Sequence, residues 1–450
     1  MATITVSAPG KVLLAGGYLV LDRAYQGLVF GLDARIYICV QVATNIETDS
    51  NSRKIIVRSP QFEKAHWVFS YIPAKDGVQI TQSHESESDT RNPFVETTLV
   101  YVLTYLFHLS IDLVGDLNIT ILADDDYYSH TKSSTKGSFS KFGVTLANAH
   151  KTGLGSSAAL VTSITAALLG AFVPHATSSE FSSHQHVIHN LAQAAHCAAQ
   201  GKVGSGFDVA AAVYGSCLYR RFTPSLLEHV GDAGSDGFGE RLHRCVENLD
   251  SHRPWDAEVL KQAVQIPRSL RLVLCDVDCG SQTPGMVKKV LSWRKERPEE
   301  ADLLWSALQQ GTEDLCAELK RLAQLEAIKE IKCENLRDTI LTIRSLIREM
   351  SNKSGVPIEP PSQTELLDAC CTVPGVVGGV VPGAGGYDAV VLLVEDNEKA
   401  LVDLQNLLSK WKSTTASGSG IAKGMVRLLG VKQDVQGIKM ERAETFEGWI

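Results

Sequence analysis

The sequence predicts an α+β fold with two domains. The chain has 450 residues, which is enough for two domains or one large one. Its first part carries β-branched and aromatic residues between turn signals, a pattern typical of strands. In its last part, helical patterns alternate with short apolar strands. With 44% hydrophobic and 21% charged residues, the composition is that of an ordinary globular protein.

The first half is expected to hold most of the strands and four helices. A first helix is predicted to begin at Asn92-Pro93, because Asn caps a helix and Pro is tolerated in its first turn. The polar segment from residue 129 to residue 151 contains four lysines and is expected to be a mobile basic flap over phosphates, with an unstructured insertion as the alternative. The expected strands are Ile4–Ser7, Lys11–Ala15, Arg35–Val42, Lys54–Arg58, Trp67–Tyr71, Leu117–Leu122 and Ser216–Arg220. The other expected helices are Ser156–Leu169, His184–Ala199 and a short alanine helix after Asp208.

A polar, glycine-containing stretch, Pro224–Gly239, is expected to be the domain junction, which divides the chain into residues 1–223 and 224–450. The second domain is expected to contain two long charged helices between residues 301 and 350, as a solvated insertion or as the surface of a homodimer. Its other expected elements are Arg271–Val277, Thr283–Trp293, a helix from Gln363, Val376–Val381, Ala389–Val394, Asn397–Trp411 and Met425–Leu429.

Composition excludes several classes of function. The net charge of −8 argues against a nucleic-acid binder, because no basic stripe is available to neutralise phosphates. We find no run long and apolar enough to span a bilayer and no signal-peptide pattern, so a cytoplasmic protein with no membrane partner is expected. The 10 cysteines lack metal-type spacing and are expected to be reduced. The histidines between His184 and His196 are expected to be solvated or capping residues rather than metal ligands.

The most informative stretch is Lys151-Thr152-Gly153-Leu154-Gly155-Ser156-Ser157, which leads into an apolar helical run. Two glycines allow a tight turn and a close approach to a ligand. The N-terminus of the following helix offers free N–H groups and a positive dipole end, which suit a phosphate. The turn is not a Walker A loop, because no Gly-Lys-Ser/Thr ends it. It indicates a phosphate site, although a Gly/Ser loop that only begins a helix would look similar.

Two further glycine motifs stand near the ends of the chain, Pro9-Gly10-Lys11 with Gly16-Gly17-Tyr18, and Pro382-Gly383-Ala384-Gly385-Gly386-Tyr387-Asp388. In this order, the three motifs resemble the signatures of the GHMP kinases, and most closely those of the fungal type of phosphomevalonate kinase. This resemblance implies a nucleotide-binding N-terminal domain of the ribosomal S5 domain 2-like type and a ferredoxin-like C-terminal domain. It also implies ATP-dependent phosphorylation of phosphomevalonate with Mg²⁺.

The resemblance assigns roles to individual residues. Lys11 matches a lysine that screens charge on the transferred group, and Asp208 matches the aspartate that faces the acceptor. The residues implied in ATP binding are Lys151, Gly153, Leu154, Gly155, Ser156 and Ser157, with Ser157 as the Mg²⁺ contact. The residues expected to bind the acceptor are Lys11, Tyr18, Lys202, Ser205, Ser281, Gln282, Thr283, Gly383, Ala384 and Gly385.

One departure from the relatives bears on the acceptor. Mevalonate kinase carries a glutamate on the helix before the aspartate turn, whereas the matching region here is His196-Cys197-Ala198-Ala199-Gln200 and has no carboxylate. A phosphate acceptor is mostly ionised at neutral pH, since its second pKa is about 6. Asp208 is therefore expected to orient Lys11 and the acceptor rather than to act as a strong base. The alternatives are mevalonate kinase, another GHMP small-molecule kinase, and a non-catalytic ligand sensor.

Overall fold

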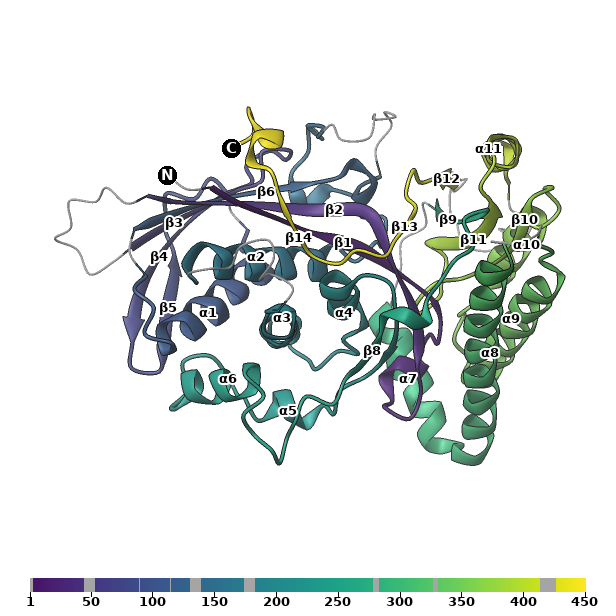
Figure 1. The fold of residues 1–450 in the computed structure, drawn as a ribbon, viewed down its shortest axis with the longest axis horizontal. Coiled ribbons are helices and arrows are strands. Elements are labelled where there is room, and N and C mark those ends of the chain that lie inside the picture. Colours follow the sequence, from purple (N-terminus) through teal and green to yellow (C-terminus); the bar gives the residue numbers. More distant parts are fainter. Residues whose placement is uncertain are drawn as a thin grey trace.

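The protein consists of two layered α/β units that meet along one side of a long curved sheet (Figure 1). The structure is a computed structural model that describes residues 3–43, 53–88, 90–113, 115–129, 139–173, 183–277, 283–326, 331–412 and 426–450. Within these ranges one sheet has ten strands and the other has four.

The large sheet has the order β14-β1-β2-β6-β3-β4-β5, with β13 and β7 also paired to β2 and β8 paired to β7. β1 and β2 are antiparallel over most of their length, and their register shifts between Pro9 and Lys11. The two strands expected at the N-terminus are therefore one strand that continues through Gly10. The bounds of these strands are β1 (Thr3–Ala15), β2 (Gly27–Ala43), β3 (Arg53–Arg58), β4 (His66–Ala74), β5 (Gly77–Gln82), β6 (Asp116–Ala123), β7 (Cys217–Arg220), β8 (Glu258–Leu260), β13 (Gln433–Asp434) and β14 (Lys439–Glu441).

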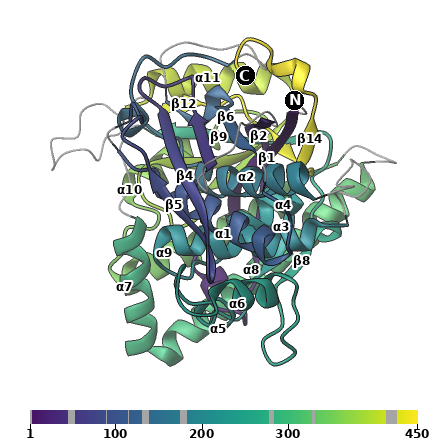
Figure 2. The same ribbon diagram turned by 90° about the vertical axis from the view of Figure 1, so that its left-hand side faces the viewer.

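Helices cover one face of this sheet, as Figure 1 and its perpendicular view in Figure 2 show. α2 lies against β1 and β2 and is buried along most of its length, which agrees with its mostly apolar sequence, rich in alanine and leucine. The side chain of Asn92 accepts a hydrogen bond from the N–H of Val95, so the predicted cap of α1 is present. The helices of this unit are α1 (Pro93–His108), α2 (Ser156–Phe172), α3 (Gln185–Gln200), α4 (Phe207–Tyr214), α5 (Ser225–Glu228) and α6 (Phe238–Val246).

The small sheet has the order β10-β11-β9-β12 and is antiparallel throughout. α9 and α10 contact β10, and α11 contacts β11 and β12. The bounds of this unit are β9 (Leu270–Val277), α7 (Thr283–Glu296), α8 (Pro298–Leu325), α9 (Glu334–Ser354), α10 (Pro361–Cys370), β10 (Val376–Val380), β11 (Ala389–Glu395), α11 (Glu398–Lys410) and β12 (Val426–Leu428).

The two charged helices differ from the expected solvated insertion. α8 and α9 pack on each other, and α9 also packs on the small sheet, so each has one buried apolar face and one charged outer face. Leu304 and Trp305 of α8 and Ile340 and Ile343 of α9 belong to the core. The helical pattern was recognised in the sequence, but the partner of its apolar face was not.

The chain leaves the large sheet later than the expected boundary between residues 223 and 224. α6 packs on α1 and α3, and β8 pairs with β7, so residues 225–260 still belong to the first unit. The chain enters the second unit at β9 and returns to the large sheet through β13 and β14. A division by packing therefore falls between β8 and β9, with the last strands added back to the first unit.

Part of the expected basic flap can be placed. Residues 139–151 run beside the first unit, and Lys151 forms a bridge with Tyr128. Residues 130–138, with Lys132 and Lys136, lie outside the described residues.

The nine cysteines in the described ranges are free, as expected, and Cys279 lies outside them.

Candidate active site

A cavity of about 750 Å³ lies where the two units meet. The first unit contributes β1, the turn η1 (Leu19–Leu21), and the turn between α3 and α4. The second contributes the end of β9, one side of α7 and the loop of residues 382–389. All three glycine motifs reach this cavity, so segments from Lys11 to Ala389 line one space.

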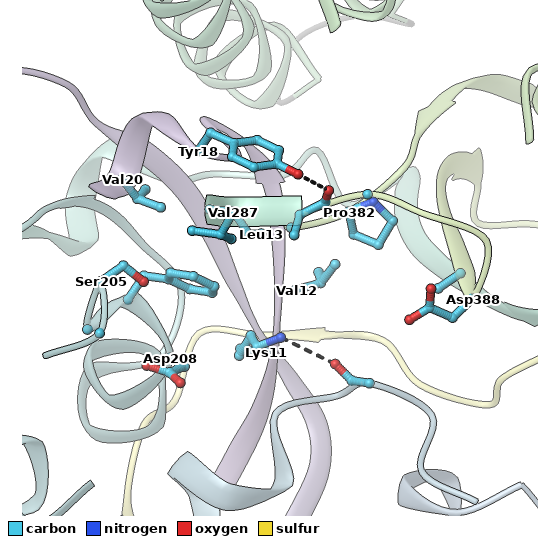
Figure 3. Close-up of a pocket in the computed structure, with 18 of the residues that line it drawn as sticks. Lys11, Val12, Leu13, Tyr18, Val20, Ser205, Asp208, Val287, Pro382 and Asp388 are labelled. Carbon is cyan, nitrogen blue, oxygen red and sulfur yellow. Dashed lines mark hydrogen bonds between the residues drawn. The ribbon is translucent and has the colours of Figure 1, made fainter. Parts of the chain in front are cut away.

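Lys11 is at the centre of the cavity, on β1 (Figure 3). Its Nζ donates a 3.3 Å hydrogen bond to the carbonyl oxygen of Gly153, and its backbone N–H donates to the carbonyl of Leu154 at 2.8 Å. The ammonium group also lies 5.6 Å from the centre of the Phe207 ring. Burial lowers the pKa of Lys11, and the nearby Asp208 carboxylate opposes that shift. This lysine is therefore held against the predicted phosphate turn, with a carboxylate that favours its charged form.

The glycine turn before α2 has the conformation that its sequence predicted. Gly153 and Gly155 have φ values of 76° and 82°, in the left-handed region that favours glycine. A Cβ on Gly155 would lie 2.8 Å from Cε of Lys11, so a side chain there would displace the lysine. α2 begins at Ser156, directly after the turn. Its first N–H groups are thus placed beside Lys11, as an anion site requires.

Residues of this turn differ in their access to the cavity. Lys151 and Gly153 line it, together with Thr152, which sequence reasoning did not select. Leu154 is buried beneath the turn. Gly155, Ser156 and Ser157 are half-buried at the start of α2 and do not line the cavity wall.

Asp208 lines the cavity from the first turn of α4, beside Lys11 in the view of Figure 3. The helix begins at Phe207 after Gly206, so Asp208 is inside its first turn, whereas the short helix was expected to begin after Asp208. One carboxylate oxygen accepts a 3.0 Å hydrogen bond from the N–H of Val209. A carboxylate in the first turn is favoured by the helix dipole.

The first and third glycine motifs touch directly. The hydroxyl of Tyr18 donates a 2.7 Å hydrogen bond to the carbonyl of Ala384, and the N–H of Gly383 donates to the carbonyl of Leu13 at 3.2 Å. A Cβ on Gly17 would lie 2.3 Å from the carbonyl oxygen of Gly383, so only glycine fits there. Tyr18 is 3% exposed and lines the cavity, as do the third-motif residues Gly383, Ala384 and Gly385.

Lys202 and Ser205 line the cavity from the turn before Asp208. This turn is braced by Arg221, whose guanidinium donates to the carbonyls of Val203 at 2.9 Å and Gly204 at 2.8 Å. The same group donates to the carbonyl of Leu21 at 2.6 Å. Arg221 also lines the cavity, and its burial lowers its pKa. Sequence reasoning missed Arg221, because it belongs to no motif and follows an ordinary strand.

The predicted contacts at the start of α7 are only partly placed. Ser281 and Gln282 lie outside the described residues, and Thr283 is the first residue of α7. Val287 and Leu291 of α7 line the cavity instead, as an apolar part of its wall. Two carboxylates of the second unit, Asp276 and Asp388, complete this side.

The histidine prediction was wrong for two of the residues on α3. His189 and His196 are 3% and 2% exposed, so neither is a solvated residue. The ring of His189 packs against Tyr214 and Trp255, away from the cavity. His196 lines the cavity, and its Nε2 is 3.1 Å from Oγ of Ser157. Within the described residues there is no group of three or more His, Cys, Asp or Glu side chains arranged for a metal ion.

Comparison with known proteins agrees with this geometry. The family description of the GHMP kinase N-terminal domain matches residues 136–216, and that of the C-terminal domain matches residues 325–413. The chain is 50% identical over 483 residues to the phosphomevalonate kinase of Aspergillus fumigatus, covering 100% of this chain and 99% of the relative. The chain is a GHMP kinase of the phosphomevalonate kinase family.

Other comparisons extend this result. The phosphomevalonate kinase of Gibberella zeae is 49% identical over 461 residues, covering 100% of this chain and 99% of the relative. A crystal structure of Streptococcus pneumoniae phosphomevalonate kinase in complex with phosphomevalonate and AMPPNP covers 90% of this chain and 95% of its own, with a TM-score of 0.57 and 16% identity. The two-domain fold of this GHMP kinase is thus the one that the three motifs predicted. In addition, none of its described helices has both the length and the apolar character needed to cross a bilayer.

Proposed function

We propose that this protein transfers the γ-phosphoryl group of ATP to the phosphate of (R)-5-phosphomevalonate, giving (R)-5-diphosphomevalonate and ADP. In the mevalonate route, this product leads to isoprenoids and sterols. The observation that carries the proposal is the identity of about one half, over the full chain, with two fungal phosphomevalonate kinases. The convergence of Lys11, Asp208 and the glycine turn in one cavity supports it.

Lys11 is the group that we assign to the transferred phosphoryl. Phosphoryl transfer leaves little covalent work to the protein, so positioning and charge screening account for most of the catalysis. Its ammonium is fixed by the Gly153 carbonyl beside the N-terminus of α2. Asp208 supports the cationic form of this partly buried lysine. A bound phosphate would support that form further, because an opposite charge stabilises it.

Asp208 is assigned an orienting role. An alcohol acceptor has to lose a proton before attack, whereas a phosphate acceptor with a second pKa of about 6 already carries a nucleophilic oxygen at neutral pH. One Asp208 oxygen is engaged with the backbone of its own helix, which fixes the direction of the carboxylate. The side chain is thus suited to hold Lys11 and the acceptor in line.

The acceptor is assigned to the part of the cavity between the Asp208 turn and the third motif. The Asp208 turn is lined by Lys202, Ser205 and Arg221. Among the described residues, the guanidinium of Arg221 donates its hydrogen bonds to the uncharged carbonyls of Leu21, Val203 and Gly204. Tyr18 and residues 383–385 form the opposite wall. The acceptor carries an anionic group at each end. The cationic side chains of Lys202 and Arg221, on one side of the cavity, can pair with such a group.

Mg²⁺ is proposed as the metal cofactor, with the Ser157 hydroxyl as its protein contact. A hydroxyl and a carboxylate are hard oxygen donors of the kind that Mg²⁺ prefers, and the ion commonly takes its other ligands from phosphates and water. Ser157 and Asp208 supply these donors, and both lie near Nε2 of His196, at 3.1 Å and 3.9 Å, so the residues present fit the ion. The ion neutralises charge on the phosphates of ATP when bound.

A panel of acceptors tests the proposed function. ADP release is measured with phosphomevalonate, mevalonate, homoserine and galactose, each supplied separately with ATP and Mg²⁺. Turnover with phosphomevalonate is expected. Turnover with mevalonate alone would make the protein a mevalonate kinase, and turnover with none would favour the ligand sensor.

A cytoplasmic location and a homodimer complete the proposal. One relative from Arabidopsis thaliana is named as a peroxisomal phosphomevalonate kinase, so imaging of the tagged protein has to distinguish the cytoplasm from the peroxisome.

The proposed homodimer has an exposed apolar surface available to it. Leu303 on α8 and Leu341 on α9 are 76% and 46% exposed and are available to a second copy. Sedimentation at micromolar concentration is expected to give twice the mass of 48.8 kDa, and a single copy would contradict the dimer.

A further inference from the structure

His196 is a buried side chain at the meeting point of the nucleotide turn and the Asp208 turn. It lies near the end of α3 and is 2% exposed. Its Nε2 is 3.1 Å from Oγ of Ser157 and 3.9 Å from a carboxylate oxygen of Asp208. The amide nitrogen of Gln200 is 3.4 Å from the same atom. The imidazole ring stacks on Phe94, with 5.6 Å between ring centres, which fixes its plane.

Nε2 of His196 has two neighbours at hydrogen-bond distance. The amide of Gln200 lies at 3.4 Å from Nε2 and the Ser157 hydroxyl at 3.1 Å, so the hydroxyl is the nearer partner. In the tautomer protonated at Nδ1, the single lone pair of Nε2 accepts the hydrogen bond of the Ser157 hydroxyl. In this arrangement the hydroxyl proton of Ser157 points toward the imidazole, so the lone pairs of its oxygen point away from the ring. A hydroxyl held in this way is prepared to face a cation or a phosphate donor.

We propose that His196 is a positioning residue that orients the Ser157 hydroxyl and fixes it relative to Asp208. It occupies the region in which mevalonate kinase carries a glutamate. Unlike a glutamate, it adds no oxygen donor, and instead it orients the oxygen of Ser157 relative to Asp208. The proposal rests on the phosphoryl transfer proposed above but not on the identity of the acceptor. Partners that orient a ligand side chain typically contribute 10–100-fold to activity or metal affinity.

Substitution of His196 separates this role from packing. His196→Phe keeps an aromatic ring against Phe94 and removes Nε2, whereas His196→Gln restores a hydrogen-bonding group. His189→Phe is the matched control, because His189 is an equally buried histidine on the same helix that packs away from the cavity. We expect His196→Phe to lower kcat/KM for ATP by about 10–100-fold, His196→Gln to recover most of it, and His189→Phe to leave it unchanged.

A double-mutant cycle with Ser157→Ala gives the decisive readout. If His196 acts through the Ser157 hydroxyl, adding Ser157→Ala to His196→Phe lowers kcat/KM little further, so the two effects are not additive. Independent effects that multiply would overturn the proposal. Equal losses in His196→Phe and His189→Phe, in step with their melting temperatures, would also overturn it, because they would indicate packing alone.

The same cycle distinguishes this proposal from the proposed function. If the protein phosphorylates another acceptor of the panel, the function is wrong and the cycle is measured with that acceptor. If it phosphorylates none, the dissociation constant of ATP with Mg²⁺, measured by calorimetry, replaces kcat/KM. Non-additive losses of ATP affinity would then support His196 as a positioning residue, and additive losses would overturn it.

Discussion

The hydroxyl of Tyr18 donates a hydrogen bond to the carbonyl oxygen of Ala384, and this contact joins two glycine motifs that are 366 positions apart. Beside it, the backbone of Gly17 is close enough to Gly383 that no side chain fits between them. The third motif therefore rests on the first strand of the large sheet. In this way the second unit is positioned over Lys11, and the cavity has a fixed wall opposite the Asp208 turn.

Tyr18→Phe tests this contact. The substitution leaves the Ala384 carbonyl without its buried partner, so we expect the free energy of unfolding to fall by about 1–2 kcal/mol. The acceptor KM should rise as well, because residues 383–385 lose their support. Tyr71→Phe removes a comparable buried hydroxyl, bonded to the carbonyl of Leu113 away from the cavity. This control should lose stability but keep its acceptor KM, and a rise in both variants would contradict a local effect.

Lys11→Met should lower kcat by at least about 100-fold, since it removes a fixed charge beside the transferred group. ATP binding should change much less, because the N–H groups of α2 remain. Rapid-quench and calorimetric measurements separate the two quantities. Lys75→Met is the control, as Lys75 is an exposed lysine outside the cavity. A Lys11→Met protein with normal kcat and weak ATP binding would contradict the assignment.

Asp208→Asn distinguishes an orienting group from a base. For an orienting carboxylate, we expect a moderate fall in kcat and a pH–rate profile that keeps its acidic limb, because the acceptor phosphate supplies its own charged oxygen. Steady-state kinetics over a range of pH measure both. A severe fall in kcat, with intact affinities and loss of an acidic limb, would assign Asp208 as a base.

Arg221 is predicted to act mainly in acceptor binding. Arg221→Lys keeps the charge but cannot reproduce the fork that holds the carbonyls of Val203 and Gly204. We expect the acceptor KM to rise by about tenfold or more, with a smaller change in the KM for ATP, because roughly 1.4 kcal/mol of binding corresponds to tenfold. Initial rates at varied acceptor and at varied ATP give the two values. Equal changes in both would place Arg221 outside the acceptor site.

His189 gives a pH dependence of stability. Burial lowers the pKa of His189 to about 4, below its ordinary value. The unfolded state therefore binds more protons between about pH 6.5 and pH 4, so the contribution of this residue is present above pH 6.5 and is lost as the pH falls. It corresponds to roughly 2 kcal/mol between pH 7.5 and pH 5.

Urea unfolding at these two pH values measures the effect. His189→Phe should lose less stability on acidification than the wild type does. His252→Gln, a change at an exposed histidine, should behave like the wild type. If the acid sensitivity of His189→Phe equals that of the wild type, His189 is not the titrating group.

Most of the fold could be predicted, because its signals are local. Asn92 caps α1, glycine turns precede α2 and α4, and the apolar face of each long helix is periodic. The covering of the small sheet by α9 was not predicted, because an amphipathic pattern does not name its partner. β5 was also missed, although its short sequence alternates apolar and polar residues as a half-buried strand does.

The site was predictable where it consists of glycine motifs and was missed where it depends on contacts between distant segments. Lys11, Asp208 and the third motif reach one cavity as expected. Ser157 and His196 are 39 positions apart, and only the packing of α2 on α3 brings them together. Arg221 and Asp276 stand at the ends of strands without any local pattern, so nothing in the sequence marked them.

Phosphorus NMR of the reaction products tests the central claim most directly. Phosphomevalonate, ATP and Mg²⁺ are incubated with the protein, and Lys11→Met is the matched control. The account predicts that the single phosphate signal of phosphomevalonate is replaced by the two coupled signals of a diphosphate, together with those of ADP. An unchanged phosphomevalonate signal, in a sample where mevalonate is phosphorylated under the same conditions, would contradict it.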